Sequence, residues 1–497
     1  MTVISRRAFV QGLAALPMAL AAPRAARAAT AYRRYDCASP QGLQMLEIYA
    51  NAVRQMQQLG PDNPMSWMWQ WYTHFVDGAT SKAAELDRVF GTTPSAQRTL
   101  AEETWNTCQS HAGQNSNHFL PWHRMFVLYF EQIVRTVSGR SDFTLPYWNY
   151  TSDDPAQRGI LPPQFRMPND PVFGSLYRPN RTSLANSGQR IDANQPVDEM
   201  DVTGIMSKTS YTTVGAEQGF CRAVDSSIHG RIHVLTGTSR NMGAVPYAGN
   251  DPLFWVHHAN IDRMWASWNR NGNKNPTDAT QYPWINNRFV FVNGSGTRVN
   301  YPLKNYFSVL ALNYDYDAYF PRPPAPLAAS ARLAKAAGGN RVSEQVARAR
   351  GGADLGGRPV NIPLLPVTAK RGSSVLGLDV ASGRRSWLVL KDLHTWSQPE
   401  VLFHVYLRAG NGVGRLDRTH YVGDINFFDA EFHDHGNAKM DMALGENFYS
   451  FDVTDLLDHI RRGGGNAARD ALMVTIVPAG TPSGGKPMVG SIELRLQ

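Results

Sequence analysis

The chain has little that would mark a disulfide scaffold or a membrane protein. It holds only three cysteines in 497 residues, which excludes a disulfide-stapled fold and a four-cysteine zinc or iron–sulfur site. After residue 28 no apolar run is long enough to cross a bilayer as a helix. We therefore expect no membrane association once an export signal is removed.

Charge of one sign is also scarce. The net charge is +8, and four arginines among the first 28 residues carry half of it. No basic run with interleaved aromatic residues occurs, so no nucleic-acid partner is expected. Hydrophobic residues make up 42% and aromatic residues 10%, which is enough for a large core and two or three domains.

The first 28 residues have the pattern of an export signal. Ser5-Arg6-Arg7-Ala8-Phe9 is followed by an apolar run and then by Ala26-Arg27-Ala28. A charged start, a short apolar stretch and an A-x-A end are typical of a signal peptide. The paired arginines before a phenylalanine resemble a twin-arginine signal, which exports folded proteins. We expect a periplasmic or secreted bacterial protein; an ordinary export signal that happens to hold two arginines is the alternative.

Helical periodicity covers most of the first two thirds of the chain. Apolar residues recur at helical spacing over 41–137, 217–236 and 254–269. The intervening 141–215 is rich in Pro, Asp, Asn and Ser and predicts long surface loops. Residues 29–320 are therefore expected to form a mainly α catalytic domain.

The last third has a different pattern. Residues 321–372 predict a linker, because 321–358 is basic and rich in Ala and Gly, with one helical stretch near 328–350. Short β-type runs follow, separated by Gly, Pro and Asn, and they predict an antiparallel β-sandwich over 373–497. These runs are 386–390, 401–407, 447–453, 472–477 and 491–496.

Histidines are the most informative residues of the helical part. His229 and His233 are four residues apart, which places both imidazoles on one face of a helix, where they can bind one metal ion. His257 and His258 begin a second helical pattern, and Asp262 follows four residues after His258, placed to hydrogen-bond a ligand ring.

Three more histidines, His74, His111 and His123, lie upstream beside aromatic residues. Imidazole ligands suit copper, zinc, iron or nickel. The residue after His229 is Gly230, not the glutamate that a zinc protease needs as its base.

Two segments resemble the copper-binding signatures of the tyrosinase and polyphenol oxidase family. They are Phe119-Leu-Pro-Trp-His123-Arg-Met-Phe and Asp251-Pro-Leu-Phe-Trp-Val-His-His258-Ala-Asn-Ile-Asp-Arg-Met-Trp. The resemblance extends over 33–320, where Tyr314-Asp-Tyr316 resembles the motif that closes the catalytic core. The region after 373, with Phe451-Asp-Val, is similar to the C-terminal domain of plant-type members.

The resemblance implies a four-helix bundle whose inward side chains hold two copper ions that bridge dioxygen as peroxide. His74, His111 and His123 would bind the first copper, and His229, His233 and His258 the second. His257 is then a neighbour with a packing or hydrogen-bonding role. The family oxidises ortho-diphenols to ortho-quinones, tyrosinases also hydroxylate monophenols, and the C-terminal domain shields the coppers.

The second ligand of the first copper departs from the family pattern. In many relatives it lies nine residues before the histidine of Pro-x-His, where this chain has Gln114. His111 is preferred because Cys108-Gln-Ser-His111 resembles the family context, but His118 stays a rival. Pro121 is expected to break any helix between His118 and His123, so two ligands that close would need a tight loop.

Three further positions leave the chemistry open. Cys108 suggests either a thioether to His111, as in some members, or a buried free thiol. Asp225 lies four residues before His229, where plant-type members have glutamate, and would act as a base or orient one. Gly230 stands where some strong hydroxylases have asparagine, which leaves monophenol hydroxylation open.

The resemblance favours a dicopper oxidase acting on a small phenol with dioxygen. An ortho-aminophenol oxidase and a non-enzymatic oxygen carrier of the hemocyanin type are the alternatives. A copper-scavenging protein without turnover is a third. The sequence names neither the natural substrate nor the oligomeric state.

Overall fold

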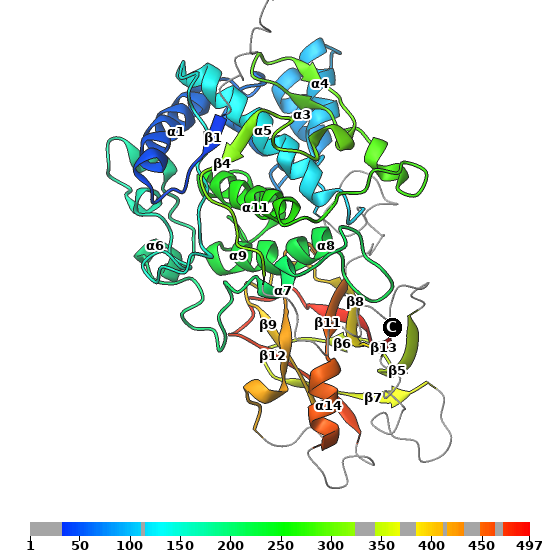
Figure 1. Ribbon diagram of the computed structural model, residues 1–497. Helices are drawn as coiled ribbons and strands as arrows, with labels where there is room; N and C mark the ends of the chain where they lie inside the picture. Colours follow the sequence, from blue (N-terminus) through cyan, green and yellow to red (C-terminus); the bar gives the residue numbers. More distant parts are fainter. Residues whose placement is uncertain are drawn as a thin grey trace, which may run out of the picture.

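The structure, a computed structural model, describes residues 32–110, 115–323, 343–367, 384–410, 415–431, 448–462 and 471–497. A helical core lies above a sheet domain in the view of Figure 1. The expected export signal, the ligand candidate His111 and residues 324–342 and 368–372 of the expected linker lie outside these residues. The longer helices are α1 (Pro40–Gln58), α2 (Trp67–His74), α3 (Lys82–Phe90), α4 (Ala96–Thr104), α5 (Phe119–Ser138), α11 (Pro252–Arg270) and α14 (Thr454–Arg462).

The core helices begin where the sequence offers a cap. The side chain of Ser66 accepts a hydrogen bond from the Trp69 N–H at the start of α2. Asp251 caps α11 in the same way, and Pro252 occupies its first turn. Such caps satisfy amide groups that have no partner inside the helix, and proline is tolerated there because its position needs no donor.

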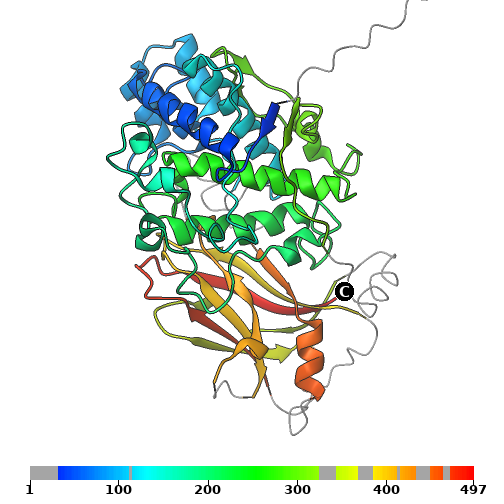
Figure 2. The same ribbon diagram turned by 60° about the vertical axis from the view of Figure 1, so that its left-hand side comes forward.

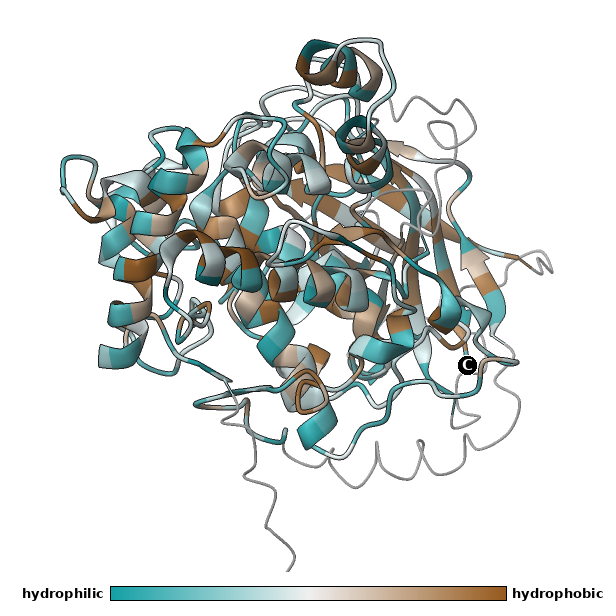
Figure 3. Cartoon of the chain, turned by 90° about the horizontal axis from the view of Figure 1, so that it is seen from above, coloured by the Kyte–Doolittle hydropathy of each residue, from teal (hydrophilic) through white to brown (hydrophobic). Residues whose placement is uncertain are grey.

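A third helical run crosses the core beside α5 and α11. It consists of α8 (Phe220–Val224), a π-helical turn η3 (Asp225–His229) and α9 (Gly230–Thr236). The predicted loop region carries only short elements: α6 (Ser183–Ser187), α7 (Thr203–Met206), η1 (Pro163–Arg166) and η2 (Phe173–Leu176). The expected helical core with long loops is therefore confirmed, and Figure 3 shows hydrophobic and hydrophilic segments alternating along its helices.

The C-terminal domain is a single antiparallel sheet of nine strands. Eight run in the order β10-β9-β12-β7-β5-β13-β8-β11, and β6 pairs with β13. The sheet curls until its outer strands β10 and β11 approach each other, so it resembles a nearly closed barrel more than two stacked sheets. The strands are β5 (Glu344–Arg348), β6 (Ala353–Asp354), β7 (Val360–Pro366), β8 (Ser386–His394), β9 (Phe403–Ala409), β10 (Tyr421–Ile425), β11 (Phe448–Asp452), β12 (Leu472–Pro478) and β13 (Met488–Leu496).

The linker prediction over 321–372 is wrong in its second half. Residues 344–366 supply β5, β6 and β7, which pair with β13 and β12. The helical stretch expected near 328–350 is a strand over Glu344–Arg348. Long-range pairing with strands more than 100 residues later overrides the weak local signal of an Ala-, Gly- and Arg-rich segment.

The sheet domain packs against the α8–α9 face of the core (Figure 2). Leu402 and Phe428 of this domain belong to the hydrophobic cluster of the helical core. The Asn426 amide donates to the Ser226 carbonyl at 2.9 Å, and Gln218 donates to the Phe448 carbonyl at 2.6 Å. No described helix is both long and apolar enough to span a bilayer.

A buried acidic pair spans this interface. Arg231 of α9 contacts Glu199 of the core at 3.1 Å and Asp424 of β10 at 3.6 Å. Burial beside Asp424 raises the pKa of Glu199 to about 9. Tyr421, His404 and Tyr449 also interact with Asp424. A proton held by Glu199 removes the repulsion between two carboxylates that share one arginine.

The raised pKa of Glu199 predicts that the free energy of unfolding falls as the pH rises from about 4.3 toward 9. The folded pKa of Glu199 lies above the unfolded value of about 4.3, so its contribution is full below pH 4.3 and is lost as the pH rises toward 9. We expect the thermal midpoint of Glu199→Gln to fall less than that of the wild type between pH 6 and pH 9. Glu47→Gln, on the exposed face of α1, is the control; equal slopes in all three proteins would contradict the assignment.

Candidate metal centre

Four helical segments bring six histidines together at the centre of the core. His74 ends α2, His123 lies in α5, and the α8–α9 run and α11 each carry two more. They form two groups in which the possible ligand atoms lie within 4.8 Å of one another. The groups are His74, Cys108 and His123, and His229, His233, His257 and His258. The groups adjoin, since the rings of His123 and His258 stack with centroids 4.4 Å apart.

Hydrogen bonds orient three of these rings. Nδ1 of His123 lies 2.8 Å from the Phe119 carbonyl oxygen, and Nδ1 of His233 lies 2.7 Å from that of Met242. Nδ1 of His229 lies 3.3 Å from the Asp225 carbonyl oxygen, and Oδ1 of the same residue is 3.2 Å away. A proton on Nδ1 leaves the Nε2 lone pair for a metal ion.

The remaining nitrogens fit a metal-binding role. Among the described residues, no hydrogen-bond partner exists for Nε2 of His229 or His233, or for either ring nitrogen of His257 and His258. An unpaired buried nitrogen is unfavourable, and coordination would remove that cost. The donor set therefore fits copper, which imidazole suits.

Burial keeps the six imidazoles neutral. None is more than 2% exposed. Burial lowers the pKa of each, to about 3 for His229 and well below the usual range for the other five. Neutral imidazole is the form that binds a metal, so the site is prepared for one at any physiological pH.

His257 lies closer to the centre than its expected role as a neighbour suggested. Its ring is parallel to that of His229, with centroids 5.6 Å apart, and its other side faces Tyr150. Its role as a packing or hydrogen-bonding neighbour of the ligands stays a prediction. The structure also places it in the same group as His258. The sequence did not predict this, because side chains at adjacent helix positions point in different directions.

His118 belongs to neither histidine group. Nδ1 lies 3.0 Å from Oε1 of Gln109, and Nε2 lies 3.1 Å from the amide nitrogen of Asn287. The expected break at Pro121 is wrong, because α5 begins at Phe119 and Pro121 sits in its first turn, where no donor is needed. His111, its rival, lies outside the described residues.

Cys108 faces the first histidine group. Its Sγ lies 3.7 Å from Nε2 of His123, and burial raises the pKa of its thiol. All three cysteines are buried and none forms a disulfide. The thioether to His111 stays a prediction.

Asp225 is held by three neighbours. Besides His229 it contacts Arg222 at 3.1 Å, and it accepts a hydrogen bond from Ser110 at 2.8 Å. Arg222 also contacts Asp429 of the sheet domain at 2.8 Å. Burial raises the pKa of Asp225, and Arg222 and Ser110 oppose that shift. Asp225 and His229 begin and end the π-helical turn that joins α8 to α9.

Asp262 does not hydrogen-bond a ligand ring, so that expectation is wrong. Its carboxylate accepts hydrogen bonds from Arg34, Arg124, Tyr314 and Tyr316. Burial alone would raise its pKa, but the two arginines lower it below the ordinary value. Asp262 instead ties α11 to α5 and to the strands β1 (Tyr32–Arg34) and β4 (Tyr314–Tyr316), which pair in parallel.

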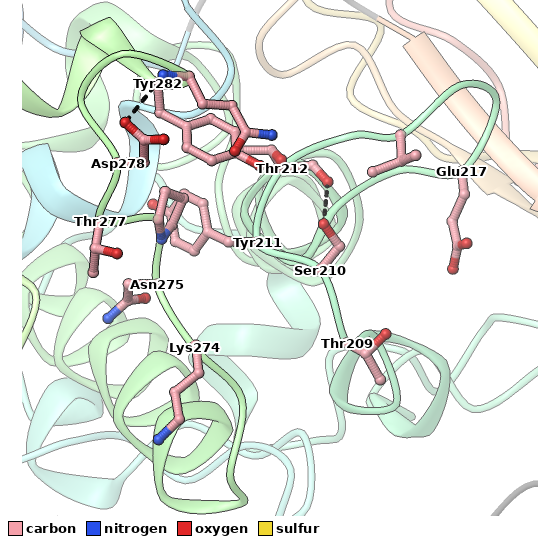
Figure 4. Close-up of a pocket in the computed structure, with 13 residues that line it drawn as sticks. Thr209, Ser210, Tyr211, Thr212, Glu217, Lys274, Asn275, Thr277, Asp278 and Tyr282 are labelled. Atoms are coloured by element: carbon pink, nitrogen blue, oxygen red, sulfur yellow. Dashed lines mark hydrogen bonds between the residues drawn. The ribbon is translucent and has the colours of Figure 1, made fainter. Parts of the chain in front are cut away.

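A separate cavity lies away from the histidines. It has a volume of about 480 Å³ and lies between the loops 209–217 and 274–282. Figure 4 shows Lys274, Asp278 and Glu217 around it, with Ser210 donating to the Thr212 carbonyl. Its lining contains no histidine, so it belongs to the surface of the core and not to the metal centre.

Comparisons with known proteins agree with this geometry. The model of the common central domain of tyrosinase matches residues 65–216 and 169–271. Tyrosinase HcTyr1 of Hahella sp. is 28% identical over 441 residues, which cover 84% of this chain and 89% of that protein. The chloroplastic polyphenol oxidase of Malus domestica is 25% identical, over 86% of this chain and 72% of that protein.

Two solved structures share the fold over almost the whole chain. Latent aurone synthase, a polyphenol oxidase, superposes with a TM-score of 0.60 and 19% identity, covering 94% of this chain and 89% of that one. Latent apple tyrosinase gives a TM-score of 0.58 with 19% identity, covering 94% and 97%. Residues 65–271 therefore match the common central domain of tyrosinase, and most of the chain is similar to tyrosinases and polyphenol oxidases. The fold is that of the two solved polyphenol oxidases, and the paired histidine groups lie within the matched domain.

The ion pairs of Asp262 with Arg34 and Arg124 predict that substitution of Asp262 lowers the stability of the fold even when no metal is bound. Asp262→Asn leaves Arg34 and Arg124 buried without their shared counter-charge, which should cost about 3–5 kcal/mol of unfolding free energy. Denaturant unfolding of the copper-free chain measures it. Asp87→Asn, which removes a half-exposed partner of Arg98, should cost less than about 1 kcal/mol; similar losses in both variants would refute the network's role.

Proposed function

We propose that the chain is an exported dicopper oxidase that uses dioxygen to oxidise ortho-diphenols to ortho-quinones and also hydroxylates monophenols. The observation that supports it is the pair of adjacent, buried, neutral histidine groups in a core that matches the common central domain of tyrosinase. His74, His111 and His123 would hold the first copper, and His229, His233 and His258 the second. The ions, when bound, supply dioxygen binding and electron transfer.

Asp225 has a positioning role in this proposal. Its backbone carbonyl accepts the Nδ1 hydrogen bond of His229 and its Oδ1 lies 3.2 Å from the same nitrogen, while Arg222 and Ser110 fix the carboxylate. A ring oriented in this way presents Nε2 to the metal and raises the basicity of that ligand. Because both carboxylate oxygens already have partners, Asp225 orients His229 and leaves direct proton abstraction from a phenol to another group.

Phe428 of the sheet domain fills the space beside the second histidine group. Its ring stacks on the ring of His233, with centroids 3.9 Å apart and planes 12° apart, and lies edge-on to His229 at 5.4 Å. A phenol that approached the second copper would meet the same apolar contact surface. We therefore propose that the C-terminal domain shields the centre, as the word latent in the names of both solved relatives suggests for those proteins.

A close contact next to His229 holds this arrangement. A Cβ added to Gly230 would lie 2.4 Å from Oδ1 of Asn426 in the sheet domain. Asn426 also receives a hydrogen bond from the Phe428 N–H, so it links the domain interface to the shielding ring. A side chain at 230 would displace the Asn426 side chain from its place in the interface.

An oxygen carrier is the second candidate, and the position of Phe428 favours it. A ring that blocks a phenol can still leave room for dioxygen. The two functions differ when the block is removed, because an oxidase then gains turnover and a carrier binds dioxygen without producing quinone.

Ligand substitutions test the copper assignment. We expect two coppers per wild-type chain and at most one in His233→Ala and His258→Ala, with catechol oxidation reduced more than about 100-fold, beyond the 10–100-fold typical of losing a ligand's hydrogen-bond partner. His257→Ala should keep two coppers. His459→Ala, on an exposed position of α14, is the control. Full copper content in His258→Ala with loss in His257→Ala would reverse the assignment of those two.

Removal of the block tests shielding. Phe428→Ala and Gly230→Ala should raise catechol turnover several-fold with the copper content unchanged. The first removes the ring that covers His233, and the second displaces the Asn426 side chain, which accepts the Phe428 N–H. Phe451→Ala, a half-buried residue elsewhere in the sheet domain, should not. Limited proteolysis within 321–342, before β5, should have the same activating effect. Unchanged turnover in all of these would leave the domain a stabilising role alone.

A further inference from the structure

His118 is a buried imidazole that neither histidine group uses. It is 5% exposed and lies against Trp284 and Phe289. The amide nitrogen of Asn287 can only donate, so Nε2 of His118 accepts and Nδ1 carries the proton. That proton points at Oε1 of Gln109, 3.0 Å away. Burial lowers the pKa of His118 to about 4, so this tautomer persists at neutral pH.

The partner of His118 holds an irregular segment. The Gln109 amide nitrogen donates to the carbonyls of Thr107 and Cys108, at 3.2 and 3.3 Å. Residues 107–110 lie in no helix or strand, so side chains supply much of what fixes them. With Oε1 bound to His118, every polar atom of the Gln109 amide is engaged.

This segment touches both histidine groups. Cys108 places Sγ at 3.7 Å from Nε2 of His123, and Ser110 donates to Asp225, which contacts His229. A displacement of the segment would therefore disturb the first group directly and the second through Asp225.

We propose that His118 is a positioning residue, whose Nδ1–H bond to Gln109 fixes the 107–110 segment against the two metal-binding groups. Only the part of this proposal that concerns copper retention rests on the proposed function. Loss of the bond frees the segment, while α5 keeps its backbone hydrogen bonds.

Substitution of His118 by Asn or by Gln tests the roles of its two ring nitrogens one at a time. Asn places its amide nitrogen near the position of Nδ1, whereas Gln places it near Nε2. His118→Asn therefore keeps the bond to Gln109, and His118→Gln and His118→Ala lose it. The first readout is thiol labelling of the copper-free full-length chain by a maleimide, with the modified cysteines assigned by mass spectrometry.

We expect Cys108 to be labelled about tenfold faster in His118→Ala and His118→Gln, because the loss of one hydrogen bond makes local opening of the segment more frequent. In His118→Asn the labelling rate should stay within about twofold of the wild-type rate. Cys37 and Cys221, which are also buried, serve as internal controls and should not change. Loss of copper to a chelator from the loaded chain should follow the same order of variants.

Two results would overturn the proposal. Unchanged Cys108 labelling in His118→Ala, with or without copper loss, would show that His118 does not hold the segment. Equal acceleration at all three cysteines, with no rescue by His118→Asn, would show only a general role in stability. If the labelling pattern appears but the wild-type chain binds no copper, the proposed function fails and the positioning role stands.

Discussion

Burial of six imidazoles at the junction of four helical segments is the constraint on which the rest of the structure depends. An imidazole taken out of water keeps at least one nitrogen that needs a partner, and here several Nε2 atoms have none among the described residues. The fold tolerates this because the aromatic surroundings keep the rings neutral and fixed. Metal coordination is the interaction that would satisfy them.

The surrounding charged residues hold the helices and not the ligands themselves. Asp262 joins Arg34 and Arg124, and Asp251 caps α11 while it pairs with Arg181 at 2.7 Å. All three ion pairs are almost fully buried, so their stability depends on accurate geometry. Ligand rings are oriented instead by backbone carbonyls, with the Asp225 carboxylate also beside His229. Buried ion pairs thus hold the helices together, whereas hydrogen bonds orient the histidine rings.

The sequence predicted the helices that carry the histidines, because long amphipathic periods and caps are local signals. Strands β8, β9, β11, β12 and β13 were predicted from the same kind of pattern. Strands β5 to β7 and β10 were not predicted; β5, β6 and β7 pair with β13 and β12, which lie more than 100 residues further along the chain. The curl of the sheet into one nearly closed layer likewise depends on pairing that no local pattern encodes.

Site residues divide in the same way. The i, i+4 spacing of His229 and His233 predicted their proximity, but the carboxylate of Asp262 turned to arginines that the spacing did not reveal. Phe428 could not have been predicted, because its contact with His233 joins residues of different domains without any motif. Pro121 was misjudged since its effect depends on its position within a helix that begins two residues earlier.

The central claim is that the two histidine groups form one dinuclear centre. It is tested most directly by counting copper and recording the electron paramagnetic resonance of the oxidised, fully loaded chain. Two Cu(II) ions held a few ångströms apart, as in other two-metal sites, should couple, giving two coppers per chain with almost no resonance signal. Two coppers per chain with the full signal of isolated ions would show two independent sites and contradict the account.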